Sequence, residues 1–526
     1  MRFRRQAPTA PVPAERGTRP TLVGTVAAAL AGASSLLSFA PLGWWPLQFA
    51  SLAYLFYQVG VGSSVRRATL LGWAFGFGWS MGGMHWLYIA LNRFGGLPAV
   101  LSAIAIALLG LYMGLFGAFA AGAAAWLRRK FTPPVWAFLL VVLPVMWGVS
   151  EWMRGWVFTG FPWAAAGYAH VDAALGGFAP LIGVYGIGIL AAVCAGCLAH
   201  LTQPRRRLQV IGVFALVLAA GGLLRLVDWT QPNGKPISVR LVQGDIAQDE
   251  KFSSEHLLGI LTRYRGLITA KPADLVAAPE TAIPVFPYQL PPGYIDELRG
   301  FAARTGSWLM FGIPFSDGPN TYSNSVAGIG PQGQTYRYDK HHLVPFGEFI
   351  PAGFRWFVDM MRIPLGDFTR GGAVQAPFAV KDQFVQPNVC YEDVFGEEIA
   401  RQLRDAPHPA TLLLNVSNLA WYGESVAIPQ HLQISRMRSM ETGRPMLRAT
   451  NNGATAVIDG KGKLQSLIPY YQQGVLEAQV QGMRGTTPYI RFGNAIFLVL
   501  SALALAGAWL TGRRYQQKKA KVQEVA

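Results

Sequence analysis

Three polar residues in the second half of the chain could together carry out acyl transfer. Glu280 lies in the segment APET, Lys340 in YDKHH and Cys390 in NVCYED, and Cys390 is the only cysteine outside the hydrophobic segments. A thiol can hold an acyl group as a thioester, a glutamate can take up a proton, and a lysine can stabilise developing negative charge. A thiol near its usual pKa of about 8.5 is mostly protonated at neutral pH, so it needs such partners. These residue types therefore predict an acyl-transfer site.

Each of these residues also has a simpler explanation. A free cysteine is often a small buried side chain, and Cys390 could close a strand in that way. Glu280 could begin a helix in PETA, and Lys340 could be a solvated charge in RYDKHH. The acidic neighbours in CYED make purely apolar burial of Cys390 less favourable. Taken alone, the residue types leave both explanations open.

Short β-rich and helical segments alternate over residues 237–485 and must position these side chains. We expect strands at 237–243, 274–280, 308–314, 323–330, 384–392, 411–418, 446–451 and 455–460. We expect helices at 253–270, 294–304, 395–404 and 426–442. This alternation predicts a layered α/β fold. Glu280, Cys390 and residues 415–418 fall at the carboxyl ends of expected strands, where such folds gather ligand-binding groups.

The rest of the chain is too apolar for a soluble protein. Its 526 residues are 52% hydrophobic and 14% charged, and the mean hydropathy is +0.28. A helix of about 20 apolar residues crosses the hydrocarbon core of a bilayer, which is about 30 Å thick. Runs of this kind predict eight membrane spans, near 21–40, 44–61, 68–91, 98–127, 134–153, 179–201, 208–227 and 492–511.

Lysines and arginines indicate the orientation of these spans. They concentrate in the N-terminal segment, in the loops after spans two, four and six, and in the C-terminal tail. The positive-inside rule places these segments, and both termini, in the cytoplasm. Most of the net charge of +17 is this loop bias, so it does not indicate nucleic-acid binding.

The spans and the change of composition divide the chain into five parts. We expect a cytoplasmic segment at 1–20, a membrane domain at 21–228, a globular domain at 229–490, an eighth span at 491–511 and a basic tail at 512–526. The globular domain would lie on the non-cytoplasmic side, and its length is sufficient for one large α/β core.

Four motifs relate the globular part to a known family. APETAIP, YDKHHLVPFGEFIP, NVCYEDVFG and NVSNLAWYGES resemble those of the carbon–nitrogen hydrolase (nitrilase) superfamily, which has a Glu–Lys–Cys triad and an αββα sandwich. KHHLVPFGEFIP, set between seven spans and an eighth, resembles the membrane-bound bacterial apolipoprotein N-acyltransferases of that superfamily. The resemblance extends to GFPWAAAGYAH in the loop after span five.

The resemblance implies a role for each matching residue. Cys390 would be the nucleophile, Glu280 the general base and Lys340 the stabiliser of the oxyanion. Glu348 in PFGEF would be a second required carboxylate, and Tyr391 and Glu392 would support the site. The chain departs from the family at Phe252, where a tryptophan is common.

The resemblance also implies a reaction. A fatty acyl group would pass from a phospholipid, with phosphatidylethanolamine as the donor, to Cys390 and then to the α-amine of the diacylglyceryl-cysteine that begins an apolipoprotein. No cofactor would be required. The protein would be a monomer in the bacterial inner membrane, with its catalytic domain in the periplasm.

Other residues are candidates for substrate contact. The segment 354–368 is apolar and aromatic, which predicts either core packing or a mobile lid that includes Trp356, Phe357 and Met360. Asn415, Ser417 and Trp421 are further candidates for contact with substrate.

A metal site is not expected. His341 and His342 would point to opposite faces of a strand, which disfavours a shared metal with Glu348 and His431. Cys194 and Cys197 lie inside a predicted span, where they indicate helix packing.

Two other functions compete with acyl transfer. A membrane-anchored amidase of the nitrilase type would use water to resolve the thioester. A transporter would need charged groups at mid-membrane, whereas His85, Glu151, Arg154 and His170 lie near span ends or in an outer loop.

Overall fold

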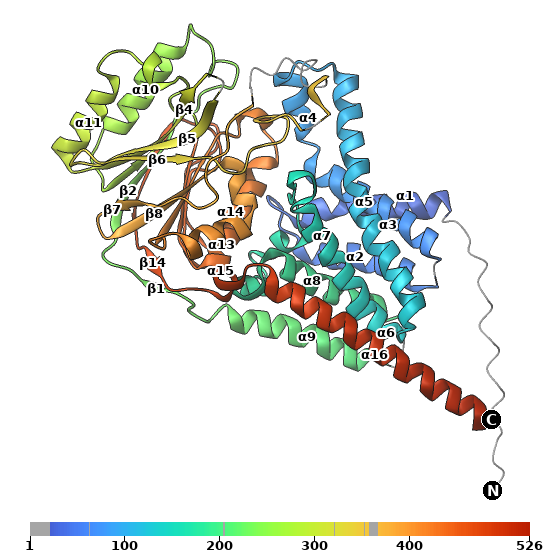
Figure 1. The fold of residues 1–526 in the computed structure, drawn as a ribbon. Coiled ribbons are helices and arrows are strands. Elements are labelled where there is room, and N and C mark those ends of the chain that lie inside the picture. Colours follow the sequence, from blue (N-terminus) through green and yellow to red (C-terminus); the bar gives the residue numbers. More distant parts are fainter. Residues whose placement is uncertain are drawn as a thin grey trace.

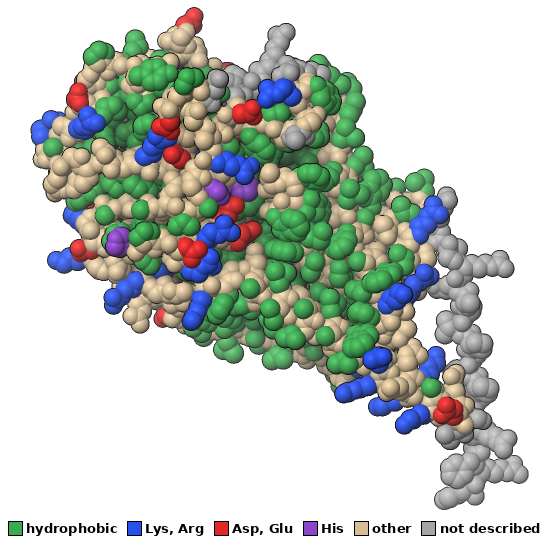
Figure 2. Space-filling view, viewed as in Figure 1, with side chains coloured by type: hydrophobic (Ala, Val, Ile, Leu, Met, Phe, Trp, Pro, Cys, Tyr) green, Lys and Arg blue, Asp and Glu red, His purple; other side chains and the backbone are tan. Residues whose placement is uncertain are grey.

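The chain folds into a helical bundle and an α/β unit that lie side by side (Figure 1). The structure is a computed structural model that describes residues 21–62, 64–202, 206–319, 321–351, 353–356 and 367–525. The segment 1–20, predicted to be cytoplasmic, lies outside these residues. Hydrophobic side chains cover most of the visible surface of the bundle, whereas charged side chains gather on the α/β unit and along the C-terminal helix (Figure 2).

The helical bundle is formed by segments from both ends of the chain. Its helices are α1 (Leu22–Ser34), α2 (Trp45–Gly60), α3 (Val65–Met84), α4 (Leu87–Ile89), α5 (Ala99–Phe131), α6 (Val135–Ala137), α7 (Leu143–Arg154), α8 (Ala179–His200), α9 (Arg207–Leu224) and α16 (Ala495–Val525). Small residues allow close approach of these helices. A Cβ atom at Gly72 in α3 would lie 2.3 Å from the carbonyl oxygen of Gly117 in α5, so the contact requires glycine.

The predicted number of eight spans is not confirmed. Within the described residues, five helical segments are long and apolar enough to cross a membrane: Ala99–Phe131, Val135–Arg154, Ala174–His200, Arg207–Leu224 and Ala495–Glu524. Helices α1, α2 and α3 occupy the first three predicted spans without meeting these criteria. Short length explains α1, which has 13 residues, and α2, which has 16. In α3 the arginines Arg66 and Arg67 at its start, together with its glycines, lower the mean hydropathy.

The α/β unit contains two six-stranded sheets. One has the order β13-β2-β3-β4-β5-β6 and the other β12-β11-β10-β9-β8-β7. The strands of the first are β2 (Ile237–Gln243), β3 (Leu275–Ala277), β4 (Trp308–Gly318), β5 (Thr321–Ile329), β6 (Thr335–Asp339) and β13 (Gly474–Val480). Those of the second are β7 (Phe378–Val380), β8 (Gln383–Val389), β9 (Leu412–Ser417), β10 (Met446–Thr450), β11 (Ala456–Ile458) and β12 (Leu464–Leu467).

Helices cover the outer faces of both sheets. Leu241 and Leu275 of the first sheet share one apolar core with Leu414 of the second, so the sheets pack face to face. Helices α10 (Leu257–Thr269) and α11 (Tyr294–Thr305) cover the first sheet. Helices α13 (Gly396–Asp405) and α14 (Ala427–Thr442) cover the second. The predicted layered fold is therefore an αββα sandwich.

All eight predicted strands and four predicted helices of this unit are present, with small shifts at their ends. Of the strands in the two six-stranded sheets, the prediction missed β6, β7, β12 and β13. Strand β13 alternates buried and exposed residues and lies at the edge of its sheet, so its apolar pattern is weak.

The entry and exit of the α/β unit lie next to each other. Strand β1 (Gln231–Pro232) follows α9, and β14 (Met483–Arg484) precedes α15 (Pro488–Phe492) and α16. These two short strands pair with each other, Gln231 opposite Arg484. The sandwich is thus closed at its base where both chain segments meet the bundle.

Helix α14 fixes the sandwich against the bundle. The indole Nε1 of Trp163 donates to Gln430 Oε1 at 2.7 Å, and the backbone N–H of Val184 donates to Glu441 Oε1 at 2.8 Å. Side chains of the bundle and of α14 also share one hydrophobic core. The two halves are therefore held in one orientation by polar and apolar contacts.

Candidate active site

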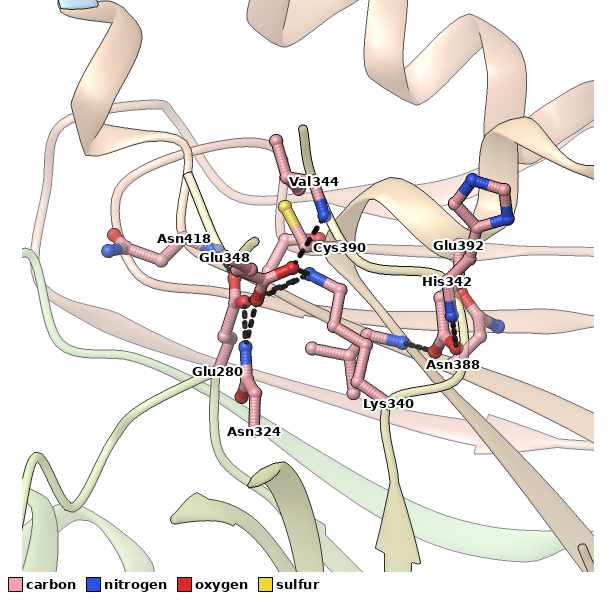
Figure 3. Close-up of polar contacts among 12 residues, drawn as sticks. Glu280, Asn324, Lys340, His342, Val344, Glu348, Asn388, Cys390, Glu392 and Asn418 are labelled. Atoms are coloured by element: carbon pink, nitrogen blue, oxygen red, sulfur yellow. Dashed lines mark hydrogen bonds and ion pairs between the residues drawn. The ribbon is translucent and has the colours of Figure 1, made fainter. Parts of the chain in front are cut away.

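The three residues that predict acyl transfer lie at the ends of strands from both sheets. Glu280 follows β3, Lys340 follows β6 directly, and Cys390 follows β8 directly. Because the sheets stack face to face, the three side chains meet at one edge of the sandwich (Figure 3). The fold thus brings together residues that are far apart in sequence.

Lys340 lies between two carboxylates. Its ammonium Nζ is 3.7 Å from Glu280 Oε1 and 2.8 Å from Glu348 Oε2. Lys340 is 1% exposed, and both glutamates are 7% exposed. Burial lowers the pKa of Lys340, but the charges of Glu348 and Glu280 outweigh this effect and raise the pKa above its ordinary value. The lysine is therefore a fixed positive charge inside the site.

Two asparagines orient the carboxylate of Glu280. The side-chain amide of Asn324 in β5 donates to Glu280 Oε1 and to Glu348 Oε1, both at 2.8 Å. The backbone N–H of Asn418 donates to Glu280 Oε2 at 2.8 Å. Sequence reasoning missed Asn324, although its place in the expected strand 323–330 is a usable signal. These bonds aim the carboxylate before any substrate binds.

Cys390 combines a strained backbone with a protonated thiol. Its φ of +52° lies in the left-handed region, which is costly for a residue with a side chain. The residue is partly exposed, unlike the residues that follow it. Burial and the charge of Glu280 raise the pKa of the thiol, while Lys340 lowers it less strongly. The resting cysteine is thus neutral and needs a base to become a nucleophile.

Glu392 joins the turn that carries Cys390 to the loop that carries Lys340. Its carboxylate accepts hydrogen bonds from the backbone N–H groups of Val389 at 2.6 Å, His341 at 2.7 Å and His342 at 3.2 Å. The hydroxyl of Tyr338 also donates to it. Burial raises the pKa of Glu392, and these bonds oppose that effect. Glu392 therefore stabilises the backbone of the site and lies apart from the cluster around Lys340 (Figure 3).

Tyr391 connects the site to the bundle. Its hydroxyl donates to the carbonyl oxygen of Gly160 at 2.9 Å, and its ring stacks on Phe161 with a centroid distance of 6.1 Å. Both partners lie in the loop after α7. The residue next to Cys390 is therefore held by the helical half of the molecule.

The other residues predicted to contact substrate differ in how deeply they are buried. Asn415 and Ser417 are fully buried, and Asn415 donates to the carbonyl oxygen of Cys390 at 3.1 Å. Both side chains share the face of β9 with Leu413, which α13 and α14 cover. Trp421 is half-buried and its ring contacts Phe94. Trp356 is 65% exposed, whereas Phe357 and Met360 lie outside the described residues.

The histidines make hydrogen bonds away from Lys340. His341 Nδ1 lies 2.8 Å from the carbonyl oxygen of Gly371, and His342 lies between Glu398 and the carbonyl oxygen of Thr159. His431 is bound to Asp393 at 2.7 Å. Among the described residues, no group of three or more histidine, cysteine or acidic side chains could hold a metal ion.

The arrangement can perform nucleophilic acyl chemistry. A partly exposed thiol lies with an oriented carboxylate that can accept its proton and an ammonium that can stabilise an oxyanion. Sequence reasoning identified the thiol, both glutamates and Lys340.

Comparisons with known proteins agree with both halves of this description. Residues 31–197 match the family described as the apolipoprotein N-acyltransferase N-terminal domain, and residues 238–489 match carbon–nitrogen hydrolase. The apolipoprotein N-acyltransferase of Ralstonia nicotianae is 48% identical over 93% of each chain. That of Bordetella bronchiseptica is 42% identical over 93% of this chain and 97% of its own. A solved amidase of the nitrilase superfamily from Nesterenkonia is 18% identical, with a TM-score of 0.37, over 51% of this chain and 98% of its own.

Proposed function

The chain belongs to the apolipoprotein N-acyltransferase family, and on this premise we propose that it moves a fatty acyl group from a phospholipid to an apolipoprotein. The acceptor is the α-amine of the diacylglyceryl-cysteine at the start of the apolipoprotein. The meeting of Glu280, Lys340 and Cys390 in one buried cluster carries this proposal.

The first half-reaction forms a thioester. Glu280 accepts the thiol proton as the sulfur of Cys390 attacks the ester carbonyl of the phospholipid. The carbonyl oxygen becomes an oxyanion, which Lys340 stabilises. When the ester C–O bond breaks, Glu280 returns the proton to the leaving oxygen. A lysophospholipid departs and the acyl group remains on Cys390.

The second half-reaction forms an amide. The uncharged α-amine of the acceptor attacks the thioester carbonyl, and Lys340 again stabilises the oxyanion. The C–S bond then breaks, and a proton from the amine passes through Glu280 to the sulfur. Free Cys390 and an N-acylated lipoprotein result, so one site serves both substrates in turn.

The helical bundle makes a lipid donor physically reasonable. Moving an acyl chain into water costs about 0.8 kcal/mol per methylene, so about 12 kcal/mol for a palmitoyl-length chain. A site that adjoins a membrane domain can leave most of the chain in the bilayer. We propose phosphatidylethanolamine as the donor and a monomer as the working form.

The topology that fits this reaction has eight crossings of the bacterial inner membrane. In this arrangement α1, α2 and α3 cross together with the five long apolar helices. Both termini lie in the cytoplasm and the catalytic sandwich lies in the periplasm, in agreement with the distribution of lysine and arginine over the loops.

Trapping the intermediate tests the proposal. The purified protein is incubated with a phospholipid that carries a labelled acyl chain, and intact-mass and peptide mass spectrometry follow the label. We expect the label on Cys390, no label on a Cys390→Ala variant, and transfer to a diacylglyceryl lipopeptide when this acceptor is added. Absence of the adduct on the wild-type protein would overturn the mechanism. Release of free fatty acid alone would indicate a hydrolase.

A further inference from the structure

A second lysine reaches the cluster from an unrelated part of the chain. Lys251 lies in the loop between β2 and α10 and is 1% exposed, although Phe252 beside it is 47% exposed. Its ammonium Nζ donates a hydrogen bond of 3.0 Å to the backbone carbonyl oxygen of Glu280. A lysine turned inward between exposed neighbours needs a reason, because burying an ammonium is unfavourable.

The hydrogen bond of Lys251 fixes the backbone that carries the base. The residue after Glu280 is Thr281, whose φ of +52° lies in the left-handed region. The carbonyl of Glu280 therefore belongs to a strained turn that needs an external partner. Gln248 of the same loop accepts a hydrogen bond of 2.9 Å from the side chain of Asn418, whose backbone N–H binds the Glu280 carboxylate. The loop thus holds Glu280 at its backbone and, through Asn418, at its carboxylate.

Lys251 also supplies a charge that the cluster lacks. Glu280 and Glu348 are two buried carboxylates, and Lys340 provides one positive charge between them. Lys251 supplies the second. Transfer of the proton from Cys390 to Glu280 breaks an S–H bond and forms an O–H bond, so the cluster keeps its total charge while a thiolate appears. A balanced cluster favours that thiolate more than a cluster with excess negative charge would.

We propose that Lys251 is a positioning residue of this active site, which fixes Glu280 through its backbone carbonyl and balances the charge that lets Cys390 form a thiolate. The role of Lys251 in catalysis rests on the proposed function. Burial lowers the pKa of Lys251 to about 8, while Glu280 and Cys390 oppose this shift. The lysine is therefore mostly charged at neutral pH.

Alkylation of Cys390 tests the proposal without any lipid substrate. The full-length protein in detergent is treated with iodoacetamide from pH 6 to pH 11, and peptide mass spectrometry gives the rate at Cys390. Three variants are compared with the wild type: Lys251→Met removes charge and donor, Lys251→Gln keeps a donor without the charge, and Lys251→Arg keeps the charge. Lys271→Met is the matched control, because Lys271 is 61% exposed and pairs with Glu477 at the surface.

The other titratable groups near Cys390 and Lys251 are the same in all variants. They are Glu280, Lys340, Glu348, Tyr422, His431 and the Arg448–Asp393 pair. A change in the alkylation profile therefore reports the charge at position 251.

We expect alkylation at pH 7 to be about tenfold slower in Lys251→Met and Lys251→Gln than in the wild type, and this difference should shrink above pH 8 as Lys251 itself loses its proton. Lys251→Arg and Lys271→Met should keep the wild-type rate at pH 7. Wild-type rates at pH 7 in folded Lys251→Gln and Lys251→Met would overturn the proposal and leave Lys251 a structural residue. Lys251→Gln decides the question if Lys251→Met does not fold. Because alkylation requires no acyl donor, its outcome is independent of whether the labelled phospholipid acylates Cys390.

Discussion

Two clusters of buried charged side chains contact the elements around Cys390, and only one is open to chemistry. In the catalytic cluster, Lys340 lies between Glu280 and Glu348 beside a partly exposed thiol. In the sealed cluster, defined by Asp393, His431, Ser435 and Arg448, every residue is at most 1% exposed. Asp393 accepts from His431 at 2.7 Å and from Arg448 at 3.1 Å, and it also binds the hydroxyl of Ser435.

The two clusters differ in whether a charged or hydrogen-bonding partner can be exchanged. The sealed cluster satisfies Asp393 on both oxygens with groups that cannot leave, so it can only stabilise the fold. The catalytic cluster shares one ammonium between two carboxylates, and the thiol beside it can donate a proton. Buried charge alone therefore does not identify an active site; an exchangeable proton and a path to solvent do.

Loss of the base should have the largest effect and should act mainly on rate. We expect Glu280→Gln to slow formation of the Cys390 thioester by about 10³-fold, because the amide cannot accept the thiol proton. The thermal midpoint should fall only modestly, because Lys340 keeps its closer partner Glu348 at 2.8 Å. The cost arises because the amide nitrogen of Gln replaces an oxygen that accepts from Asn324 or Asn418. Single-turnover mass spectrometry measures the rate, and Glu477→Gln at the surface is the control. A loss below tenfold would contradict the role of Glu280.

Loss of a partner in the sealed cluster should act on stability instead. Arg448→Met leaves Asp393 buried without its counter-charge, which should lower the free energy of unfolding by about 3–5 kcal/mol. Thioester formation per folded molecule should change much less than in Glu280→Gln. Denaturant or thermal unfolding in detergent measures the first effect. The double variant Arg448→Met with Asp393→Asn should regain part of the stability; a further loss would show that the pair is not the cause.

The smallest expected effect is a loss of stability at acidic pH, which arises from His431 in the sealed cluster. Burial lowers the pKa of His431 below its ordinary value of 6.5, and Arg448 acts in the same direction while Asp393 opposes it. Below pH 6.5 the unfolded chain therefore binds a proton that the folded chain does not, so stability falls as the pH decreases from 6.5. Thermal midpoints between pH 7.5 and pH 5 should fall less steeply in His431→Gln. Equal slopes in the two proteins would contradict this assignment.

The sequence predicted the layered α/β fold and the candidate site residues because both leave local signals. Strands such as 237–243 are apolar runs bounded by turns, and Glu280 and Cys390 end such runs. The resemblance of four motifs to a known family then assigned roles that spacing alone left open. Helix α3 was harder to classify, because its glycines serve packing and reduce its apolar signal.

The positioning residues could not be predicted in the same way. Lys251 stands in the polar run DEKFSS, which is typical of a solvated loop, and only the fold turns it inward. Asn415 and Ser417 have the residue types of a binding site but are fully buried, and Asn415 donates to the carbonyl oxygen of Cys390. Local pattern indicates which residues could react, whereas contacts between distant segments decide which of them are buried and which come together.

The pairing of β1 with β14 makes the sandwich an insertion between two neighbouring points of the helical protein. Its first and last residues leave the bundle at neighbouring points, as in domains that tolerate transplantation into a host loop. A short linker between residues 230 and 485 could therefore replace the entire sandwich without separating α9 from α16. The chain therefore leaves and re-enters the helical bundle at a single point, which the pairing of β1 with β14 marks.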